Sequence, residues 1–393
     1  MDYLNKLKST VSTTVSQLSG VLPGNPVTRE YEVGKQIASA GPDLLWKIYS
    51  GYKKSTKQEA AIFVLEKKLL DKYSKRDKDV AIDIFVKGVA QLTRLRHPQI
   101  LTVQHALEES RESLAFATEP VFASLANIVG RHENIPTPVP SQLKDYKLFD
   151  VEIKYGLQQL TEGLIFLHND VKLLHGNLCP ESIVVNHQGA WKIFGFDFCS
   201  TSNQSENKSW SVKEPDRDVP SISQANLDYM APEIGQGKRF GANSDTTITC
   251  RSSADMYSLG CIIASIYQNG NSPFKMDGDV DHFYRHAMSN AMVTRFDGIP
   301  SELVDYIRSL TSASPEQRPD AHHFVKINFF DDVGVKTLNY LDSLFQWDNL
   351  QKSQFYKGFP PFSHNFIVIR NNFIYNDYLL DYLSYVLINS FHL

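Results

Sequence analysis

The sequence predicts an α+β fold with two lobes, a small β-rich lobe followed by a larger helical lobe. The first observation is a series of short apolar stretches of strand type between residues 29 and 120, interrupted by one helical stretch at 80–95. The second is a mainly helical pattern from about residue 150 onward. The third is the length of 393 residues with 42% hydrophobic and 21% charged residues, which suits one large domain with extensions.

The expected elements follow in chain order. The helix at 80–95 ends before His97-Pro98, and Glu119-Pro120-Val121 connects the two lobes. Two polar segments, 200–228 and 234–252, are predicted to be a loop and an insert. The strands expected in the first lobe lie at 31–37, 44–49, 60–65, 101–105 and 114–118.

The two ends of the chain differ from its centre. Residues 1–28 form an amphipathic segment, predicted to be a helix docked on the domain or, alternatively, a helix that binds weakly to a membrane surface or to a partner. Residues 331–357 are predicted to be a helical linker. Residues 358–393 hold nine aromatic and three charged residues, an atypical apolar tail that suggests an alternative end to a longer protein. The apolar stripe of the first segment consists of Leu4, Leu7, Val11, Val15 and Leu18.

Composition excludes several classes of protein. The formal net charge of −4 gives no footprint for nucleic acid. No apolar run of the length needed to span a bilayer is present, and the N-terminus lacks the apolar core of a signal peptide. The four cysteines have no CxxC spacing, so we expect a reducing, cytoplasmic location and no zinc site or disulfide framework; they are Cys179, Cys199, Cys250 and Cys261.

Several motifs occur in a fixed order in the second half of the chain. They read His-Gly-Asn-Leu-Cys-Pro-Glu-Ser at 175–182, Gly-Phe-Asp at 195–197, Tyr-Met-Ala-Pro-Glu at 229–233, Asp-Met-Tyr-Ser-Leu-Gly at 255–260 and Ser-Pro-Glu-Gln-Arg-Pro at 314–319. In this order and spacing they resemble the protein kinase fold, over about 29–330 with lobes at about 29–120 and 121–330. The resemblance implies a buried pair between Glu233 and Arg318.

The same resemblance implies that the catalytic parts are lost. Phe63 stands where kinases have the lysine that binds phosphate, and Gly88 where its glutamate partner lies. Asn177 replaces the catalytic base, and an amide cannot accept the proton of a substrate hydroxyl. Cys179 replaces the lysine of the catalytic loop. Ser182 and Gly195 replace the two metal ligands, so we expect no intact catalytic residue and no metal site.

The resemblance implies that the residues which build the framework of the kinase fold are retained. They are the spine residues Leu92, Val103, His175 and Phe196, with Asp255 as their anchor.

A nucleotide site stays open as an alternative. The stretch at 37–45 lacks the glycines of a phosphate-binding loop and predicts a plain β-hairpin. A cleft closed by Phe63 is one interpretation, and a cleft that binds ATP weakly without magnesium is the other. The residues that would then surround the adenine are Leu45, Ala61, Glu119, Val121 and Val184.

The chain is similar to the Scy-like, coated-vesicle-associated pseudokinases over about 1–358. Landmarks are Gln-Leu-Thr-Arg-Leu-Arg-His-Pro at 91–98 and Gly-Phe-Asp-Phe-Cys at 195–199. The resemblance implies a scaffold in clathrin-dependent traffic between Golgi and endosomes, peripheral on their membranes. It also implies clathrin and adaptor partners bound through a region after the kinase-like domain, which this sequence does not contain.

Two other interpretations of the function stay open. One is an atypical, weakly active ATP-dependent Ser/Thr kinase, which would need Asp197, Ser182 or Lys67 as substitutes. The other is a fragment produced from an aberrant transcript.

Overall fold

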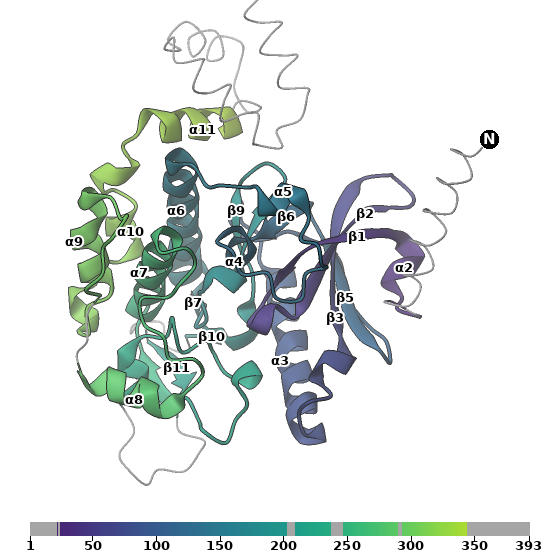
Figure 1. Cartoon of the computed structure of the whole chain (residues 1–393), viewed down its shortest axis with the longest axis horizontal. Coiled ribbons are helices and arrows are strands. Elements are labelled where there is room, and N and C mark those ends of the chain that lie inside the picture. Colours follow the sequence, from purple (N-terminus) through teal and green to yellow (C-terminus); the bar gives the residue numbers. More distant parts are fainter. Residues whose placement is uncertain (1–21, 23, 203–208, 237–246, 290–292, 344–393) are drawn as a thin grey trace, which may run out of the picture.

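The computed structural model describes residue 22 and residues 24–202, 209–236, 247–289 and 293–343. The predicted apolar stripe at 4–18 and the tail at 358–393 lie outside the described residues. Two lobes are formed, a sheet lobe and a helical lobe, which lie side by side in Figure 1. The predicted α+β architecture is confirmed.

The first lobe contains one five-stranded antiparallel sheet with the order β1-β2-β3-β5-β4. Helix α3 (Lys75–Arg94) packs on its inner face through buried residues such as Phe85 and Leu92. The helix starts five residues before the predicted 80–95 because the Ser74 hydroxyl accepts a bond from the Asp77 backbone N–H, which caps its N-terminus. The strands are β1 (Tyr31–Ala40), β2 (Trp46–Lys53), β3 (Glu59–Glu66), β4 (Val103–Glu109) and β5 (Ser113–Thr118).

The outer face of this sheet is covered by the start of the chain. Helix α2 (Val27–Glu30) lies against the sheet (Figure 1), and Leu22 and Val27 are buried in a second apolar cluster with residues of β2, β3 and β5. The amide of Asn25 donates to the Ser113 hydroxyl (3.2 Å), which fixes the segment to β5. The sheet is therefore buried on both faces.

The second lobe is built around helix α7 (Ser253–Tyr267), of which twelve of fifteen residues are buried, so it is apolar on all sides. Beside it, helix α6 (Asp150–Ile165) packs on a small sheet, and Trp191 approaches Gly156 so closely that a Cβ there would lie 2.2 Å from the indole. The sheet has the order β6-β8-β9, formed by β6 (Val121–Ser124), β8 (Ile183–Asn186) and β9 (Trp191–Ile193). The other helices are α4 (Leu125–Ile128), α5 (Ser141–Lys144), α8 (Val280–Ser289), α9 (Ser301–Leu310), α10 (Ala321–Phe324) and α11 (Val333–Ser343).

Part of the predicted polar loop at 200–228 is strand. Strand β10 (Ser200–Thr201) pairs with β7 (Leu173–Leu174), and β11 (Trp210–Lys213) pairs with β12 (Thr247–Cys250) from the predicted insert. Trp210 is buried and its indole N–H donates to the Lys172 carbonyl (2.9 Å), so this aromatic side chain attaches the segment to the lobe.

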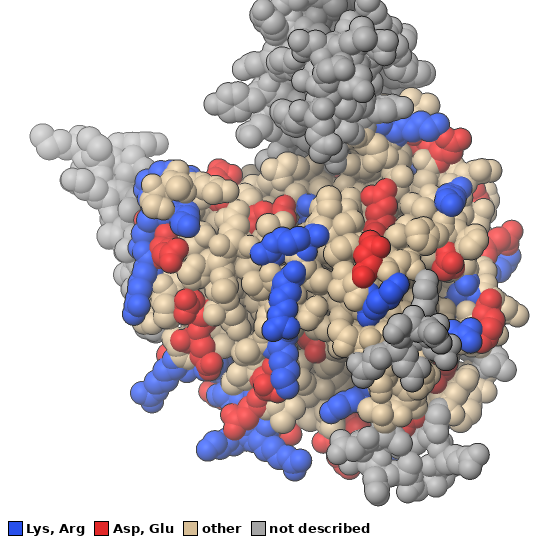
Figure 2. Space-filling model, turned by 180° about the vertical axis from the view of Figure 1, so that it is seen from behind, with Lys and Arg blue, Asp and Glu red and all other residues tan. Residues whose placement is uncertain are grey.

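The distribution of charged side chains and the hydropathy of the helices bear on what the surface can bind. Basic and acidic side chains are intermingled over the face seen in Figure 2. Within the described residues, no helix combines the length and apolarity that crossing a bilayer requires.

Candidate functional site

The candidate site lies between the lobes, where the turn after β1, strand β3, helix α3 and the two loops at 175–182 and 195–197 meet. These are the positions at which the resemblance implies nucleotide, metal and catalytic groups. The structure determines what each replacement does there.

Phe63 fills the space expected for a phosphate-binding ammonium group. It faces Phe116 of β5 across the sheet, with ring centroids 4.9 Å apart, and Phe194 at 5.2 Å. All three rings are at most 2% exposed. The three packed aromatic rings form a water-excluding plug, an environment in which an unpaired phosphate charge would be strongly disfavoured.

The two lysines that follow β3 point elsewhere. The ammonium of Lys67 pairs with Glu109 at 2.5 Å and donates to the Ser110 carbonyl at 2.9 Å. The ammonium of Lys68 pairs with Glu66 at 2.6 Å on the outside of the lobe. Neither ammonium group lies in the cleft, so Lys67 does not substitute for the lysine that Phe63 replaces.

Gly88 and Asp197 occupy each other's space. A Cβ built on Gly88 would lie 2.3 Å from Oδ1 of Asp197, so only glycine on α3 admits this carboxyl. Oδ2 of Asp197 is buried without a hydrogen-bond partner among the described residues. Burial raises the pKa of Asp197 to about 7. The Asp197 carboxyl thus lies against α3 through Oδ1, and its Oδ2 lies 3.7 Å from where a Cβ on Gly195 would be.

Gly195 and Ser182 offer no metal ligand in this arrangement. Gly195 has φ 76° and ψ 53°, a left-handed conformation that glycine adopts without strain. The Ser182 hydroxyl donates to the Cys179 carbonyl (2.9 Å) and accepts from the Cys179 N–H (3.0 Å), so it serves its own loop. In the described part of the chain, no three His, Cys, Asp or Glu side chains gather closely enough to hold a metal ion.

The Asn177 side chain holds two segments of the chain together, whereas a catalytic base at this position would accept the proton of a substrate. Its side-chain oxygen accepts a bond from the Asn226 backbone N–H (2.8 Å), which joins the loop at 175–182 to the segment before Tyr229. Cys179 is buried, and burial together with the nearby Glu181 raises the pKa of its thiol well above the usual value. The thiol therefore stays neutral and cannot replace a lysine charge.

The turn between β1 and β2 closes the β-hairpin that the sequence predicts at 37–45, in which Ala40 pairs with Trp46. Residues Pro42–Leu44 form a 3₁₀ turn in which Asp43 and Leu44 have positive φ of 51° and 53°. The Gly41 N–H donates to the Glu181 carbonyl (2.8 Å), so the turn is folded onto the second lobe. The predicted hairpin is confirmed, whereas the left-handed residues at its tip and the bond to the second lobe were not expected, because contacts between the lobes are not local in sequence.

Ser39 and Asn127 form a buried connection between the lobes that the sequence analysis missed. The Ser39 N–H donates to Oδ1 of Asn127 (2.8 Å), and Nδ2 of Asn127 donates to the Ser39 hydroxyl (3.1 Å) and to the Arg131 carbonyl (2.8 Å). The Ser39 hydroxyl also donates to the Glu133 carbonyl (2.8 Å). Ser39 and Asn127 are both at most 1% exposed, so the bonds between them are shielded from water.

The residues predicted to surround an adenine line the same closed region. Four of them are at most 5% exposed: Leu45, Ala61, Val121 and Val184. Glu119, the fifth, accepts bonds from the Thr102 N–H (3.0 Å) and the Asn186 amide (3.0 Å), so its carboxylate is engaged in the connector. A nucleotide site at these positions stays a prediction.

The framework residues lie together as the sequence analysis expects. The His175 ring packs on Phe196 with centroids 5.0 Å apart, and Leu92 and Val103 belong to the same apolar core. Asp255 accepts bonds from the backbone N–H groups of His175 (2.8 Å) and Gly176 (2.9 Å). A third bond joins it to the His168 ring at 2.8 Å. Burial alone would raise the pKa of Asp255, but these bonds hold it below its usual value.

Glu233 and Arg318 form the implied pair. Two parallel bonds of 2.8 Å join the guanidinium to the two carboxylate oxygens, and the Arg318 side chain is fully buried. The arginine also donates to the carbonyls of Ser312 and Ser253. This geometry locks the end of the segment at 229–233 onto α7 and the loop before α10.

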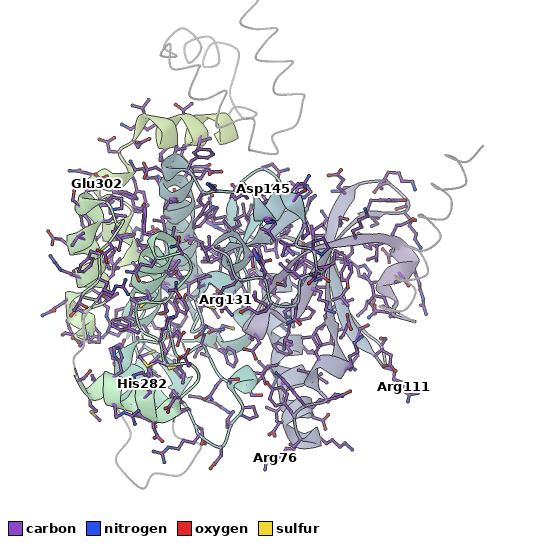
Figure 3. The ribbon with its side chains drawn as sticks, in the orientation of Figure 1. Arg76, Arg111, Arg131, Asp145, His282 and Glu302 are labelled. Atoms are coloured by element: carbon purple, nitrogen blue, oxygen red, sulfur yellow. The ribbon has the colours of Figure 1, made fainter. Side chains whose placement is uncertain are left out.

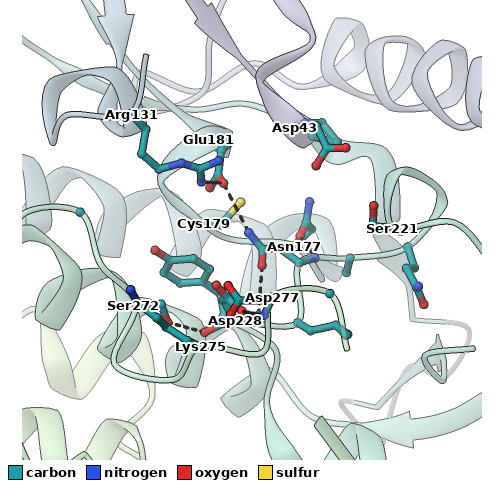
Figure 4. Close-up of a pocket in the computed structure, with 18 of the residues that line it drawn as sticks. Asp43, Arg131, Asn177, Cys179, Glu181, Ser221, Asp228, Ser272, Lys275 and Asp277 are labelled. Atoms are coloured by element: carbon teal, nitrogen blue, oxygen red, sulfur yellow. Dashed lines mark hydrogen bonds and ion pairs between the residues drawn. The ribbon is translucent and has the colours of Figure 1, made fainter. Parts of the chain in front are cut away.

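One open pocket of about 420 Å³ lies beside the closed cleft, between the β1–β2 turn and the segment at 221–229. Figure 4 shows the guanidinium of Arg131 facing the carboxylate of Glu181, which are an ion pair, and Asp228 and Lys275 across the pocket. Arg131 lies in the middle of the view in Figure 3, between the two lobes, whereas Arg76 and Arg111 lie at its edge. Asn177 and Cys179 line this pocket, whereas Phe63, Phe116 and Phe194 do not.

Comparison with known proteins gives the following relationships. A family model for the protein kinase domain matches residues 46–330. SCY1-like protein 2 of Homo sapiens is 51% identical over 363 residues, which are 91% of this chain and 38% of that protein. The protein kinase-like protein SCY1 of Saccharomyces cerevisiae is 28% identical over 351 residues, 80% of this chain and 42% of that protein.

A third relative carries a name that concerns activity. The Dictyostelium discoideum protein named probable inactive serine/threonine-protein kinase scy1 is 25% identical over 328 residues, 83% of this chain and 34% of that protein. The chain therefore spans about two fifths or less of the length of these relatives.

Proposed function

The chain belongs to the protein kinase domain family, and we propose that it is a pseudokinase, a kinase-like domain that acts as an interaction scaffold without efficient phosphate transfer. The observation that carries this proposal is the plug of Phe63, Phe116 and Phe194 where a phosphate-binding lysine would act. The carboxyl of Asp197 supports it further, because it is buried against Gly88 and no three metal-ligating side chains gather around it among the described residues.

The buried connections between the lobes support the scaffold role. The bonds between Ser39 and Asn127 and between Gly41 and Glu181 join the two lobes directly. A domain that is closed by its own side chains presents one surface to partners, whereas an enzyme must open to exchange nucleotide. We propose that the domain works without a metal–nucleotide cofactor and that any ATP binding is weak and independent of magnesium.

The cellular role is proposed from the similarity to SCY1-like protein 2 and from the resemblance given by the sequence landmarks. We propose a cytoplasmic scaffold, peripheral on Golgi, endosomal or clathrin-coated vesicle membranes, that takes part in clathrin-dependent traffic. Clathrin and adaptor proteins are its proposed partners, and nucleic acid is not. Co-purification of residues 1–358 and of a longer form from the same cells tests whether the kinase-like domain itself contributes to partner binding.

A thermal-shift titration tests the pseudokinase proposal directly. ATP is added with and without magnesium, and an active Ser/Thr kinase serves as a positive control. We expect no magnesium-dependent rise in Tm for this chain. A large magnesium-dependent rise, together with phosphate transfer that Asn177→Ala abolishes, would establish the alternative of an active kinase.

A further inference from the structure

The contact between Gly88 and Asp197 has the form of a switch. In the kinases that this chain resembles, an ion pair holds the helix corresponding to α3 to the cleft. Phe63 and Gly88 replace the two residues of that pair here. The structure nevertheless keeps α3 packed on the turn at 196–198, and the Asp197 carboxyl lies where a Cβ on Gly88 would be, 2.3 Å from Oδ1. An acidic side chain thus lies where the helix is docked, without a base opposite it.

We propose that Asp197 is a proton-operated latch, which docks helix α3 when its carboxyl is neutral and loosens the helix when the carboxyl ionises. A neutral carboxyl in the dry contact with Gly88 costs less free energy than a buried charge there. An ionised one, with Oδ2 lacking any hydrogen-bond partner among the described residues, is stabilised only if water reaches it. Water enters when α3 moves away, so ionisation and undocking of α3 are coupled.

The groups around Asp197 do not compensate its charge. On α3, the nearby Asp83 and Lys87 pair with each other at the surface at 2.6 Å. From the catalytic loop, His175 is neutral because burial lowers its pKa. On the segment of Asp197 itself, burial raises the pKa of the Cys199 thiol to about 12, so this group is neutral as well.

The direction of the effect follows from the burial of the carboxyl. The docked state binds the proton more tightly than the undocked state, because burial raises the pKa of Asp197 to about 7 from the 3.9 of a solvated aspartate. Undocking therefore becomes easier as the pH rises from about 4 to 7 and levels off above 7. Between pH 6 and pH 8 the population of undocked α3 should grow roughly tenfold.

Hydrogen exchange of the α3 amides tests the latch. The wild-type chain and Asp197→Asn are labelled at pH 6 and pH 8, with labelling times scaled to keep the intrinsic exchange equal. We expect the tenfold rise in opening in the wild type and none in Asp197→Asn, which is uncharged at both values. Asp83→Asn removes an exposed carboxyl of the same helix and should behave as the wild type.

A second variant and a second readout keep the test decisive if Asp197→Asn does not fold. Gly88→Ala places a methyl group where the carboxyl lies, so α3 should be loosened at both pH values, and the rise between them should be lost. Fluorescence of Trp46, which packs on Phe85 of α3 at 6.1 Å, reports the same movement. A wild type whose α3 exchanges equally at both values, or an Asp197→Asn variant with an unchanged pH response, would overturn the proposal.

Discussion

The buried bonds between Ser39 and Asn127 give a prediction that can be worked out in magnitude. Asn127→Ala removes two bonds to Ser39 and one to the Arg131 carbonyl. At about 1 kcal/mol each, these bonds contribute about 3 kcal/mol, and leaving the buried Ser39 N–H unpaired adds to the loss. We expect the free energy of unfolding to fall by about 4 kcal/mol, a large share of the stability of a typical domain.

Equilibrium urea unfolding followed by tryptophan fluorescence measures this loss. Asn271→Ala is the matched control, because the Asn271 amide makes an exposed bond to the Gln268 carbonyl within its own turn and should cost less than about 1 kcal/mol. Hydrogen exchange should also become faster at the Ser39 and Gly41 amides in Asn127→Ala alone. An Asn127→Ala variant that loses no more stability than Asn271→Ala would refute the idea that this connection holds the lobes closed.

Three further changes probe the site. Arg318→Met removes the two-bond pair and leaves the Glu233 carboxylate without its partner, so it should lower the free energy of unfolding by about 3–5 kcal/mol in denaturant titration, whereas a loss under about 1 kcal/mol would show that the pair is not structural. Phe63→Lys alone should give no phosphate transfer in a radiolabel assay, because the base and metal ligands stay absent, and measurable turnover would contradict this. Asp197→Asn should raise stability at pH 8 by up to about 4 kcal/mol and leave it unchanged at pH 4, since the cost of the raised pKa accumulates between about pH 4 and 7; equal gains at both values in thermal unfolding would exclude that origin.

The sequence predicts those parts of the fold that depend on periodicity and local signals. The strands and α3 follow from apolar spacing, and the pair of Glu233 and Arg318 follows from motifs in order. The left-handed turn at Asp43 and the bond of Ser39 to Asn127, 88 residues away, depend on contacts between the lobes, which no local pattern reports. A serine and an asparagine at these positions are also common in turns and caps, so their residue types gave no signal.

For the candidate site, too, residue identity predicts some features and only the structure shows the others. Which catalytic groups are replaced is evident from residue identity at Phe63, Gly88 and Asn177. How the replacements interlock is not, because the direction of the Asp197 side chain is set by the 3₁₀ turn of 196–198 and by the space that Gly88 leaves. Likewise, the pairing of β11 with β12 joins two polar stretches whose composition is typical of loops.

The cover on the outer face of the first sheet has a practical consequence for anyone who cuts this chain. A fragment that begins at residue 46, where the family match starts, would lack β1, Val27 and Leu22. It would leave Ile62 and Val64 of β3 open to solvent beside an unpaired β2 edge, which is a combination that favours association of sheets between molecules. We expect such a fragment to precipitate, and one that retains residues 22–45 to stay monodisperse in size-exclusion chromatography.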